Sequence, residues 1–266
     1  LKQWQETHPL IVQWLQEARG RIVDSLAKEF SIATKANKND LVTEVDRATE
    51  RFFIEKIRKT FPDHKIIGEE GFGDAVQSTD GVIWLIDPID GTMNFVHQRQ
   101  NFCIALAVYE NGTGVAGYIY DVMRDELYYA LRGQGAFFQE ERLPELKDVP
   151  LEEALIGMNA LWVVENKRAD HRRIGPLVHR VHGIRSYGSA ALEMAYVATG
   201  RLNGYISFHL MPWDFAAGKV IVEEVGGKVT RASGEPVSIL EKGSLLVTTP
   251  GLHETFVREF LSGIEK

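Results

Sequence analysis

The sequence of 266 residues is almost devoid of cysteine, since Cys103 is the only one. A single cysteine can form no disulfide within the chain and cannot provide a cysteine-rich zinc site. Proteins of oxidising compartments often rely on disulfides, so this composition fits a reducing compartment. We therefore expect a cytoplasmic protein.

The sequence also lacks a long apolar run and an excess of basic residues. No apolar stretch approaches the roughly 20 residues that a helix needs to cross a membrane. Charged residues recur throughout residues 1–30, so we expect neither a signal peptide nor a membrane span there. The 30 Lys and Arg are outnumbered by 37 Asp and Glu, which gives a formal net charge of −7. We expect no membrane and no nucleic acid polymer among its partners.

The first half of the sequence combines helical periodicity with a series of short strands. Apolar residues make up 44% of the chain, which is enough for a substantial core. The expected elements are helices at 11–26 and 47–60 and strands at 65–67, 82–86, 102–109, 115–120, 126–131 and 136–138. Tight-turn pairs such as Asn111-Gly112 indicate that the strands after residue 102 form an antiparallel meander. We predict an α+β domain over residues 1–143.

The second half alternates strands with helices after a polar, proline-bearing stretch at 143–151. The expected elements are strands at 154–158, 184–187, 205–208, 228–230 and 244–248, and helices at 166–182, 190–198, 213–224 and 252–264. Alternation of this kind indicates an α/β layer. We predict a second, α/β domain over residues 144–266.

The most informative stretch is the apolar run Val82 to Ile86, which ends on Asp87-Pro88-Ile89-Asp90-Gly91-Thr92. Two carboxylates, three positions apart, leave a buried strand at one point. Pro88 fixes φ, and Gly91 permits a tight turn or the close approach of a ligand. Clustered buried carboxylates need a positive partner, and a hard divalent cation with oxygen ligands provides one. The residues themselves therefore favour a metal site over a surface Asp-Gly turn.

Two other acidic points follow the same logic. The strand at 65–67 ends on Glu69 and Glu70, so a second apolar strand meets acid at its exit. Asp214 stands where the helix at 213–224 begins. It is either a helix N-cap or a metal ligand that the second domain contributes.

Five runs, taken together, resemble the inositol monophosphatase family of the larger fructose-1,6-bisphosphatase-like superfamily. They are Asp40 to Asp46, Gly68 to Glu70, Trp84 to Phe95, His182 to Ala191, and Trp213 to Gly227. The resemblance covers nearly the whole chain in order. It implies a layered α-β-α-β-α sandwich, dependence on Mg²⁺, sensitivity to Li⁺ and usually a homodimer. The implied activity is hydrolysis of inositol monophosphate, or of a related small phosphorylated polyol, sugar or nucleotide, by a metal-activated water.

The resemblance also implies metal ligands in this chain. Glu69, Asp87 and the carbonyl of Ile89 would hold the first Mg²⁺, and Glu69 also counts among the catalytic residues. Asp87, Asp90 and Asp214 would hold a second ion, and a third, weaker ion would lie near Glu69 through water. Two cations about 4 Å apart can clamp the attacking and leaving oxygens of a phosphoryl transfer.

The same resemblance implies a proton relay and substrate contacts. Thr92, paired with Asp46, would take the proton of the attacking water, because a threonine alone is a poor base. The remaining implied contacts are the backbone N–H groups of Gly91 and Thr92 for phosphate, Gly188, Ser189, Ala190 and Asp214 for the substrate, and Lys35, Glu70 and Ser207 as further candidates. Lys35 would approach the metal-bound water or the loop ligands, unless it is a solvated surface lysine.

Two positions depart from the family pattern. Met93 stands where many relatives have a second threonine. Ser207 occupies the place where inositol-specific members carry a glutamate that binds sugar hydroxyls. This departure leaves open a phosphatase of broader specificity that acts on NADP or fructose bisphosphate.

Three rival interpretations can be weighed from spacing. A haloacid-dehalogenase-type phosphatase has its two carboxylates two positions apart, whereas Asp87 and Asp90 are three apart. An EF-hand needs alternating ligands and a terminal Glu, which are absent here. A catalytically silent metal-binding homologue should lack a ligand or a relay residue, but all of those named above are present.

Overall fold

The computed structural model describes residues 2–27, 32–34 and 41–264, so that Lys35 and the beginning of the run Asp40 to Asp46 lie outside the described residues. The helices are α1 (Lys2–Leu26), α2 (Glu44–Thr60), α3 (Thr92–His97), α4 (His171–Ile174), α5 (Ala190–Ala198), α6 (Pro212–Glu224) and α7 (Leu252–Thr255). The strands are β1 (Ile32–Thr34), β2 (Leu41–Thr43), β3 (Lys65–Gly68), β4 (Val82–Asp90), β5 (Cys103–Glu110), β6 (Thr113–Asp121), β7 (Glu126–Leu131), β8 (Gly135–Phe138), β9 (Glu141–Arg142), β10 (Leu155–Met158), β11 (Gly183–Arg185), β12 (Gly204–Leu210), β13 (Lys228–Thr230) and β14 (Gly243–Thr248).

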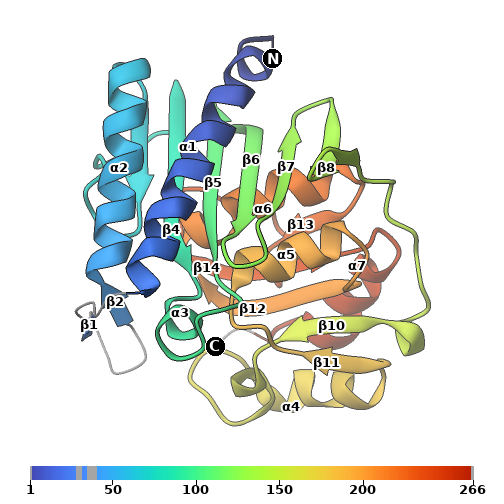
Figure 1. Ribbon diagram of the computed structural model, residues 1–266. Helices are drawn as coiled ribbons and strands as arrows, with labels where there is room; N and C mark the ends of the chain where they lie inside the picture. Colours follow the sequence, from blue (N-terminus) through green and yellow to red (C-terminus); the bar gives the residue numbers. More distant parts are fainter. Residues whose placement is uncertain (1, 28–31, 35–40, 265–266) are drawn as a thin grey trace.

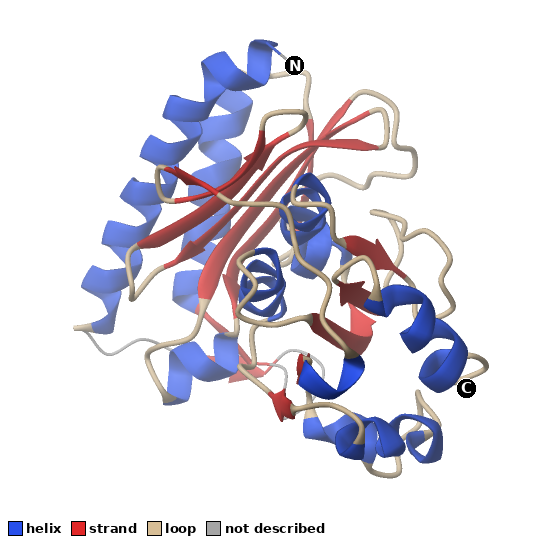
Figure 2. Ribbon diagram, turned by 90° about the vertical axis from the view of Figure 1, so that its right-hand side faces the viewer, coloured by secondary structure: helices blue, strands red, loops and turns tan. Residues whose placement is uncertain are grey.

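The elements form alternating layers of helix and sheet (Figure 1). One sheet has seven strands in the order β3 to β9, and the other has five in the order β11-β10-β12-β14-β13. The pair α1 and α2 covers the outer face of the larger sheet, and α4 and α7 cover the outer face of the smaller one. Figure 2 shows α5 and α6 between the two sheets. The predicted α-β-α-β-α sandwich is confirmed.

Within the described ranges, no helix combines the length and the apolar character that crossing a bilayer requires.

α2 begins three residues before the predicted start because its first turn is capped. Thr43 accepts the backbone N–H of Val45 and Asp46 with its hydroxyl, while Asp46 accepts the backbone N–H of Thr43. Such a reciprocal capping box satisfies N–H groups that otherwise have no partner at a helix start. It also fixes the direction of the Asp46 side chain.

β4 is longer than the predicted strand 82–86 and carries the acidic stretch within it. The strand pairs with β5 from Val82↔Glu110 to Asp87↔Ala105, shifts register at a bulge, and resumes at Asp90↔Cys103. β-bulges commonly re-aim side chains beside active sites. The two carboxylates therefore lie on a hydrogen-bonded strand rather than in a loop that follows it.

Two predicted helices of the second half are shorter than expected. The prediction of a helix at 166–182 was wrong over most of that range, since only α4 and a 3₁₀ segment at Gly175–His179 form there. Pro176 lies inside this range, and proline disrupts the interior of an α-helix. The closing helix at 252–264 consists of α7 followed by a π-helical segment at Phe256–Leu261.

The two halves of the chain meet through small residues. α6, which follows the predicted boundary, packs on β6 so closely that a Cβ on Gly117 would lie 2.5 Å from the carbonyl oxygen of Ala217. A Cβ on Gly218 would meet Met194 of α5 at 2.7 Å. One continuous core therefore includes residues from both halves, among them Leu85, Ile119, Met194 and Ile221.

Replacing Gly117 with Ala is expected to destabilise the protein by about 1–3 kcal/mol, because the added methyl forces α6 away from the sheet. Gly20→Ala in α1 is the matched control, since a Cβ there meets nothing within 4 Å. That change should stabilise the helix by up to about 1 kcal/mol. Urea unfolding of both variants measures the difference, and a shift of the same sign in both would contradict this account.

Candidate active site

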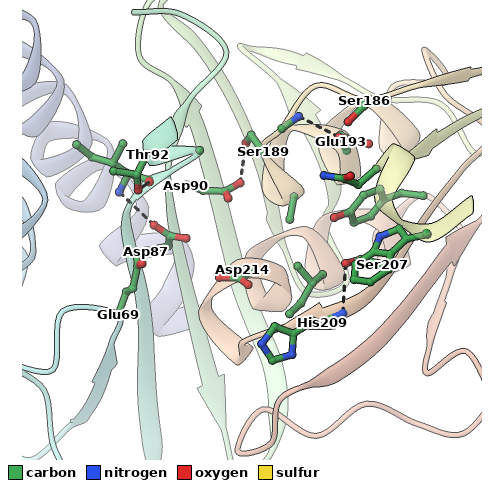
Figure 3. A pocket seen from close by; sticks show the side chains of 18 residues that line it. Glu69, Asp87, Asp90, Thr92, Ser186, Ser189, Glu193, Ser207, His209 and Asp214 are labelled. Carbon is green, nitrogen blue, oxygen red and sulfur yellow. Dashed lines mark hydrogen bonds between the residues drawn. The ribbon is translucent and has the colours of Figure 1, made fainter. Parts of the chain in front are cut away.

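A cavity of about 290 Å³ lies where the ends of β3 and β4 meet the starts of α5 and α6 and the strand β12 (Figure 3). Its walls come from segments that are far apart in the sequence. The lining residues that carry the argument below are Glu69, Asp87, Ile89, Asp90, Gly91, Thr92, Gly188, Ser189, Ala190, Glu193, Ser207, His209 and Asp214. Lys35 lies outside the described residues. Every other site residue predicted above lies in this cavity or behind it, except Glu70, which turns toward α2.

Four carboxylates converge in the cavity: those of Glu69, Asp87, Asp90 and Asp214. Asp87 is only 2% exposed and Asp90 is 9% exposed. The pKa of Asp87 is raised well above its ordinary value, first by burial and then by the charges of Glu69, Asp90 and Asp214. The contribution of these three neighbours indicates that the four groups share one electrostatic environment.

The donor chemistry of this cluster fits a hard divalent cation. All the clustered side-chain donors are carboxylate oxygens, which Mg²⁺ prefers. Among the described residues that line the cavity, His209 alone carries a basic group, so the protein itself offers little compensation. Asp87 Oδ1 accepts the backbone N–H of Ile89 at 3.1 Å, which holds that carboxylate against the strand. In the described part of the chain no three such groups already surround a common point, so the donor set rather than a coordination geometry supports the cation.

Asp90 is fixed by the start of α5. Its Oδ2 accepts hydrogen bonds from the Ser189 hydroxyl at 2.6 Å and from the Ala191 backbone N–H at 2.7 Å. Burial raises the pKa of Asp90 to about 6, although these two bonds oppose the rise. Ser189 is itself 2% exposed, and its hydroxyl also caps α5 by accepting the N–H of Leu192. Ser189 is one of the residues predicted to touch substrate, and its hydroxyl is engaged within the protein.

Asp214 takes part in the start of α6 and also lines the cavity. α6 begins at Pro212, so Asp214 lies in the first turn rather than at the N-cap. Its Oδ2 accepts the backbone N–H of Met211 at 2.8 Å, which satisfies one donor at the helix start. The same side chain lines the cavity across from Asp87 (Figure 3).

Thr92 and Asp46 form the predicted pair. The Thr92 hydroxyl lies 3.3 Å from Asp46 Oδ1 and 3.2 Å from the carbonyl oxygen of Ile89, and it can donate to either. The other oxygen of Asp46 is held by Thr43. Burial is the largest cause that raises the pKa of Asp46 to about 6, and Glu69 and Glu70 add to it. Asp46 can therefore both lose and gain a proton near neutral pH.

Gly91 is required by the backbone between Asp90 and Thr92. Its φ of 94° lies in the left-handed region, where a side chain is strained. A Cβ there would also lie 3.3 Å from the carbonyl oxygen of Gly188. This contact places the start of α3 directly beside the segment that leads into α5.

Sequence reasoning missed Glu193, which braces the segment before α5. Its Oε1 accepts the backbone N–H of Tyr187 at 2.9 Å and of Gly188 at 3.2 Å. Its Oε2 has no hydrogen-bond partner and faces Gly157, where an added Cβ would lie 2.3 Å from this oxygen. Glu193 is the one charged residue in the otherwise apolar run of α5, and that isolation was the available signal.

The remaining candidates divide between the wall and the exterior of the cavity. Ser207 lines the wall from β12 and is 6% exposed. Gly188 and Ala190 line the opposite wall at the start of α5. Glu70 instead turns toward α2, where its Oε2 lies 3.8 Å from Arg47 Nε. The structure therefore gives Glu70 no place in the lining.

Comparisons with known proteins identify relatives of this chain. The model of the "Inositol monophosphatase family" matches residues 3–265. The chain is 52% identical to the inositol-1-monophosphatase of Bacillus subtilis (strain 168) over 97% of both chains. The crystal structure of inositol monophosphate bound SaIMPase-II superposes on this chain with a TM-score of 0.87 at 38% identity. The match covers 97% of this chain and 94% of that one. An IMPase/NADP phosphatase complexed with Mg²⁺ and phosphate has a TM-score of 0.91 at 29% identity over 99% of both chains.

The buried Glu193 predicts a pH-dependent stability. Burial is the main cause that raises the pKa of Glu193 to about 7. Because the folded state favours the protonated form, this contribution is fully present below about pH 4.5 and is lost as pH rises through 7. Glu193→Gln keeps the acceptor for Tyr187 and Gly188 and should remove about 2–3 kcal/mol of this pH dependence.

Urea unfolding in EDTA at pH 5 and pH 8.5 measures this effect. Relative to the parent protein, Glu193→Gln should gain stability at the higher pH. The exposed Glu152→Gln is the matched control and should follow the parent at both values. Parallel pH profiles for Glu193→Gln and the parent protein would contradict the prediction.

Proposed function

The chain belongs to the inositol monophosphatase family, and from that premise we propose that it is a Mg²⁺-dependent phosphomonoesterase that acts on inositol monophosphate or a related small phosphorylated polyol, sugar or nucleotide. One observation carries the proposal. Four carboxylates, from the residue after β3, from β4 and from α6, meet in a single cavity beside the hydrogen-bonded pair Thr92 and Asp46. A cluster with so much negative charge can bind a phosphate ester only together with cations.

Glu69, Asp87 and the carbonyl of Ile89 are the proposed ligands of one Mg²⁺, and Asp87, Asp90 and Asp214 are those of a second. A third ion near Glu69 completes the proposal of two or three per site. A related structure that is complexed with Mg²⁺ and phosphate supports the choice of metal. Bound Mg²⁺ would neutralise charge on the transferring phosphoryl group and lower the pKa of the attacking water.

The relay of Thr92 and Asp46 would handle the proton of that water. Thr92 Oγ1 accepts the proton as its own hydroxyl proton passes to Asp46 Oδ1. Thr43 keeps the Asp46 carboxylate in place during the transfer. With a pKa of about 6, Asp46 is largely ionised at neutral pH and available as the acceptor. No side chain needs to form a covalent phosphoryl intermediate, in contrast to the haloacid-dehalogenase alternative.

The leaving alcohol would lie against Ser207, His209 and the start of α5. Ser207 replaces the glutamate expected of an inositol-specific enzyme and presents only a hydroxyl to the cavity. This observation favours, as a second candidate, a broader phosphatase that accepts NADP or fructose bisphosphate. A related structure described as an IMPase/NADP phosphatase supports that candidate. A homodimer, a cytoplasmic location, Li⁺ sensitivity and the division at residue 144 remain predictions.

Phosphate release from a substrate panel tests the proposed function. The EDTA-stripped protein is assayed with inositol monophosphate, NADP, fructose 1,6-bisphosphate and adenosine bisphosphate while Mg²⁺ is titrated, with and without Li⁺. We expect turnover only with Mg²⁺. Asp90→Asn removes one charged ligand and should lower kcat at least 100-fold without loss of fold. Metal binding without turnover on any of these esters would indicate a silent homologue, and full activity of Asp90→Asn would exclude Asp90 as a ligand.

Thr92→Val tests the relay, because valine keeps the size of the side chain and removes its hydroxyl. We expect kcat to fall about 10²–10⁴-fold at saturating Mg²⁺, the range in which proton transfer contributes to catalysis. The melting temperature should change little. Thr92→Ser retains the hydroxyl and serves as the control. A kcat for Thr92→Val within fivefold of the parent enzyme would rule out the relay.

A further inference from the structure

Glu50 is a fully buried carboxylate that lies behind the cavity rather than in its lining. It belongs to α2 and is 0% exposed. Its Oε2 accepts the backbone N–H of Glu70 at 2.6 Å, and its Oε1 accepts that of Phe72 at 2.9 Å. Both oxygens thus accept hydrogen bonds from the loop that follows β3.

The structure leaves room for this carboxylate at a specific place. A Cβ on Gly68 would lie 2.4 Å from the Glu50 carboxyl carbon, so glycine at that position permits the contact. Two neighbours of Glu50 on α2 hold the same loop. Arg51 stacks over the ring of Phe72 at 4.2 Å, and Arg47 pairs with Glu70 at 3.8 Å. α2 therefore holds this loop through hydrogen bonds to its backbone, a cation–π contact and an ion pair.

Glu69 lies between two anchors of this loop. Its own N–H donates to the carbonyl of Ile86 in β4 at 3.2 Å. The next N–H along the chain is the one that Glu50 accepts. The backbone on both sides of the Glu69 side chain is therefore fixed. Burying a carboxylate costs free energy unless its hydrogen bonds offset the loss of solvation. If this position were needed only for packing, an apolar residue would fill it at lower cost.

We propose that Glu50 is a positioning residue that holds the loop of Glu69 in the place where that carboxylate can bind a cation. Asp46 lies one helical turn before Glu50 and accepts from Thr92. One face of α2 would thus align a metal ligand and the proton relay together. The inference rests on the proposed function, because the position of Glu69 matters in this way only if the site holds a metal.

Glu50→Gln is the direct test. Glutamine has one oxygen, so one of the two N–H groups of the loop must lose its acceptor. Mn²⁺ binding is measured by electron paramagnetic resonance on the EDTA-stripped protein without substrate. We expect the affinity to fall on the order of tenfold, the lower end of the effect of outer-shell changes at metal sites. At saturating Mg²⁺, kcat should return to within threefold of the parent enzyme while the Mg²⁺ activation constant stays raised.

Asp74→Asn is the matched control, because it alters another carboxylate of the same loop. Asp74 Oδ2 accepts the backbone N–H of Ile66 at 2.9 Å, so it holds β3 and not the backbone N–H groups of Glu70 and Phe72. Its Mn²⁺ affinity should stay within twofold of the parent. Glu50→Asp keeps the charge but shortens the reach by one methylene. It should weaken Mn²⁺ binding and lower the melting temperature less than Glu50→Gln does. If Glu50→Gln does not fold, Mn²⁺ binding is measured on Glu50→Asp instead.

The outcomes separate the two ideas. If Glu50→Gln and Glu50→Asp lower the melting temperature but bind Mn²⁺ as the parent does, Glu50 is merely structural and the inference is overturned. If Asp74→Asn weakens binding equally, the effect belongs to the loop as a whole and Glu50 has no special role. If the parent protein binds no Mn²⁺ and releases no phosphate, the proposed function itself fails.

Discussion

The mutual repulsion of four carboxylates gathered in one cavity is the constraint on which the rest of the structure depends. Asp87 shows it most clearly, since burial and the charges of three neighbours all raise its pKa. Each of these charges is costly to bury and raises the cost of burying the others. The surrounding structure therefore has to hold these groups in place, and it does so with backbone hydrogen bonds.

Three helices supply most of that restraint. The start of α5 donates two hydrogen bonds to Asp90, and Met211 at the N-cap of α6 donates one to Asp214. A favourable dipole at a helix start adds to these bonds. α2 acts differently, since Asp46 and Glu50 accept hydrogen bonds from groups on and after the strands. The four carboxylates come from both halves of the chain, and apolar residues of both halves form one continuous core, which links the positions of the carboxylates to the packing of α5 and α6 on the sheets.

The errors of sequence reasoning have identifiable physical causes. The helix expected at 166–182 has suitable apolar spacing, but a proline inside it and the packing of short turns on β10 and β12 prevent a continuous helix. The strand expected at 82–86 continues to Asp90 because β5 supplies partners across a bulge. Periodicity reports which face of a segment is apolar, and it contains no information about a partner strand.

The sequence by itself determined the acidic stretch and the family, because short, specific motifs encode backbone turns and side-chain chemistry together. The layered fold and the pairing of Thr92 with Asp46 followed from the resemblance to that family. Only the tertiary structure decided that Asp214 faces Asp87, that the Ser189 hydroxyl serves Asp90, and that Glu70 turns away from the cavity. The first two outcomes depend on contacts between segments about 100 or more residues apart, whose geometry follows from the packing of α5 and α6 and not from local pattern. The third depends on how the loop after β3 packs on α2, where Arg47 meets Glu70.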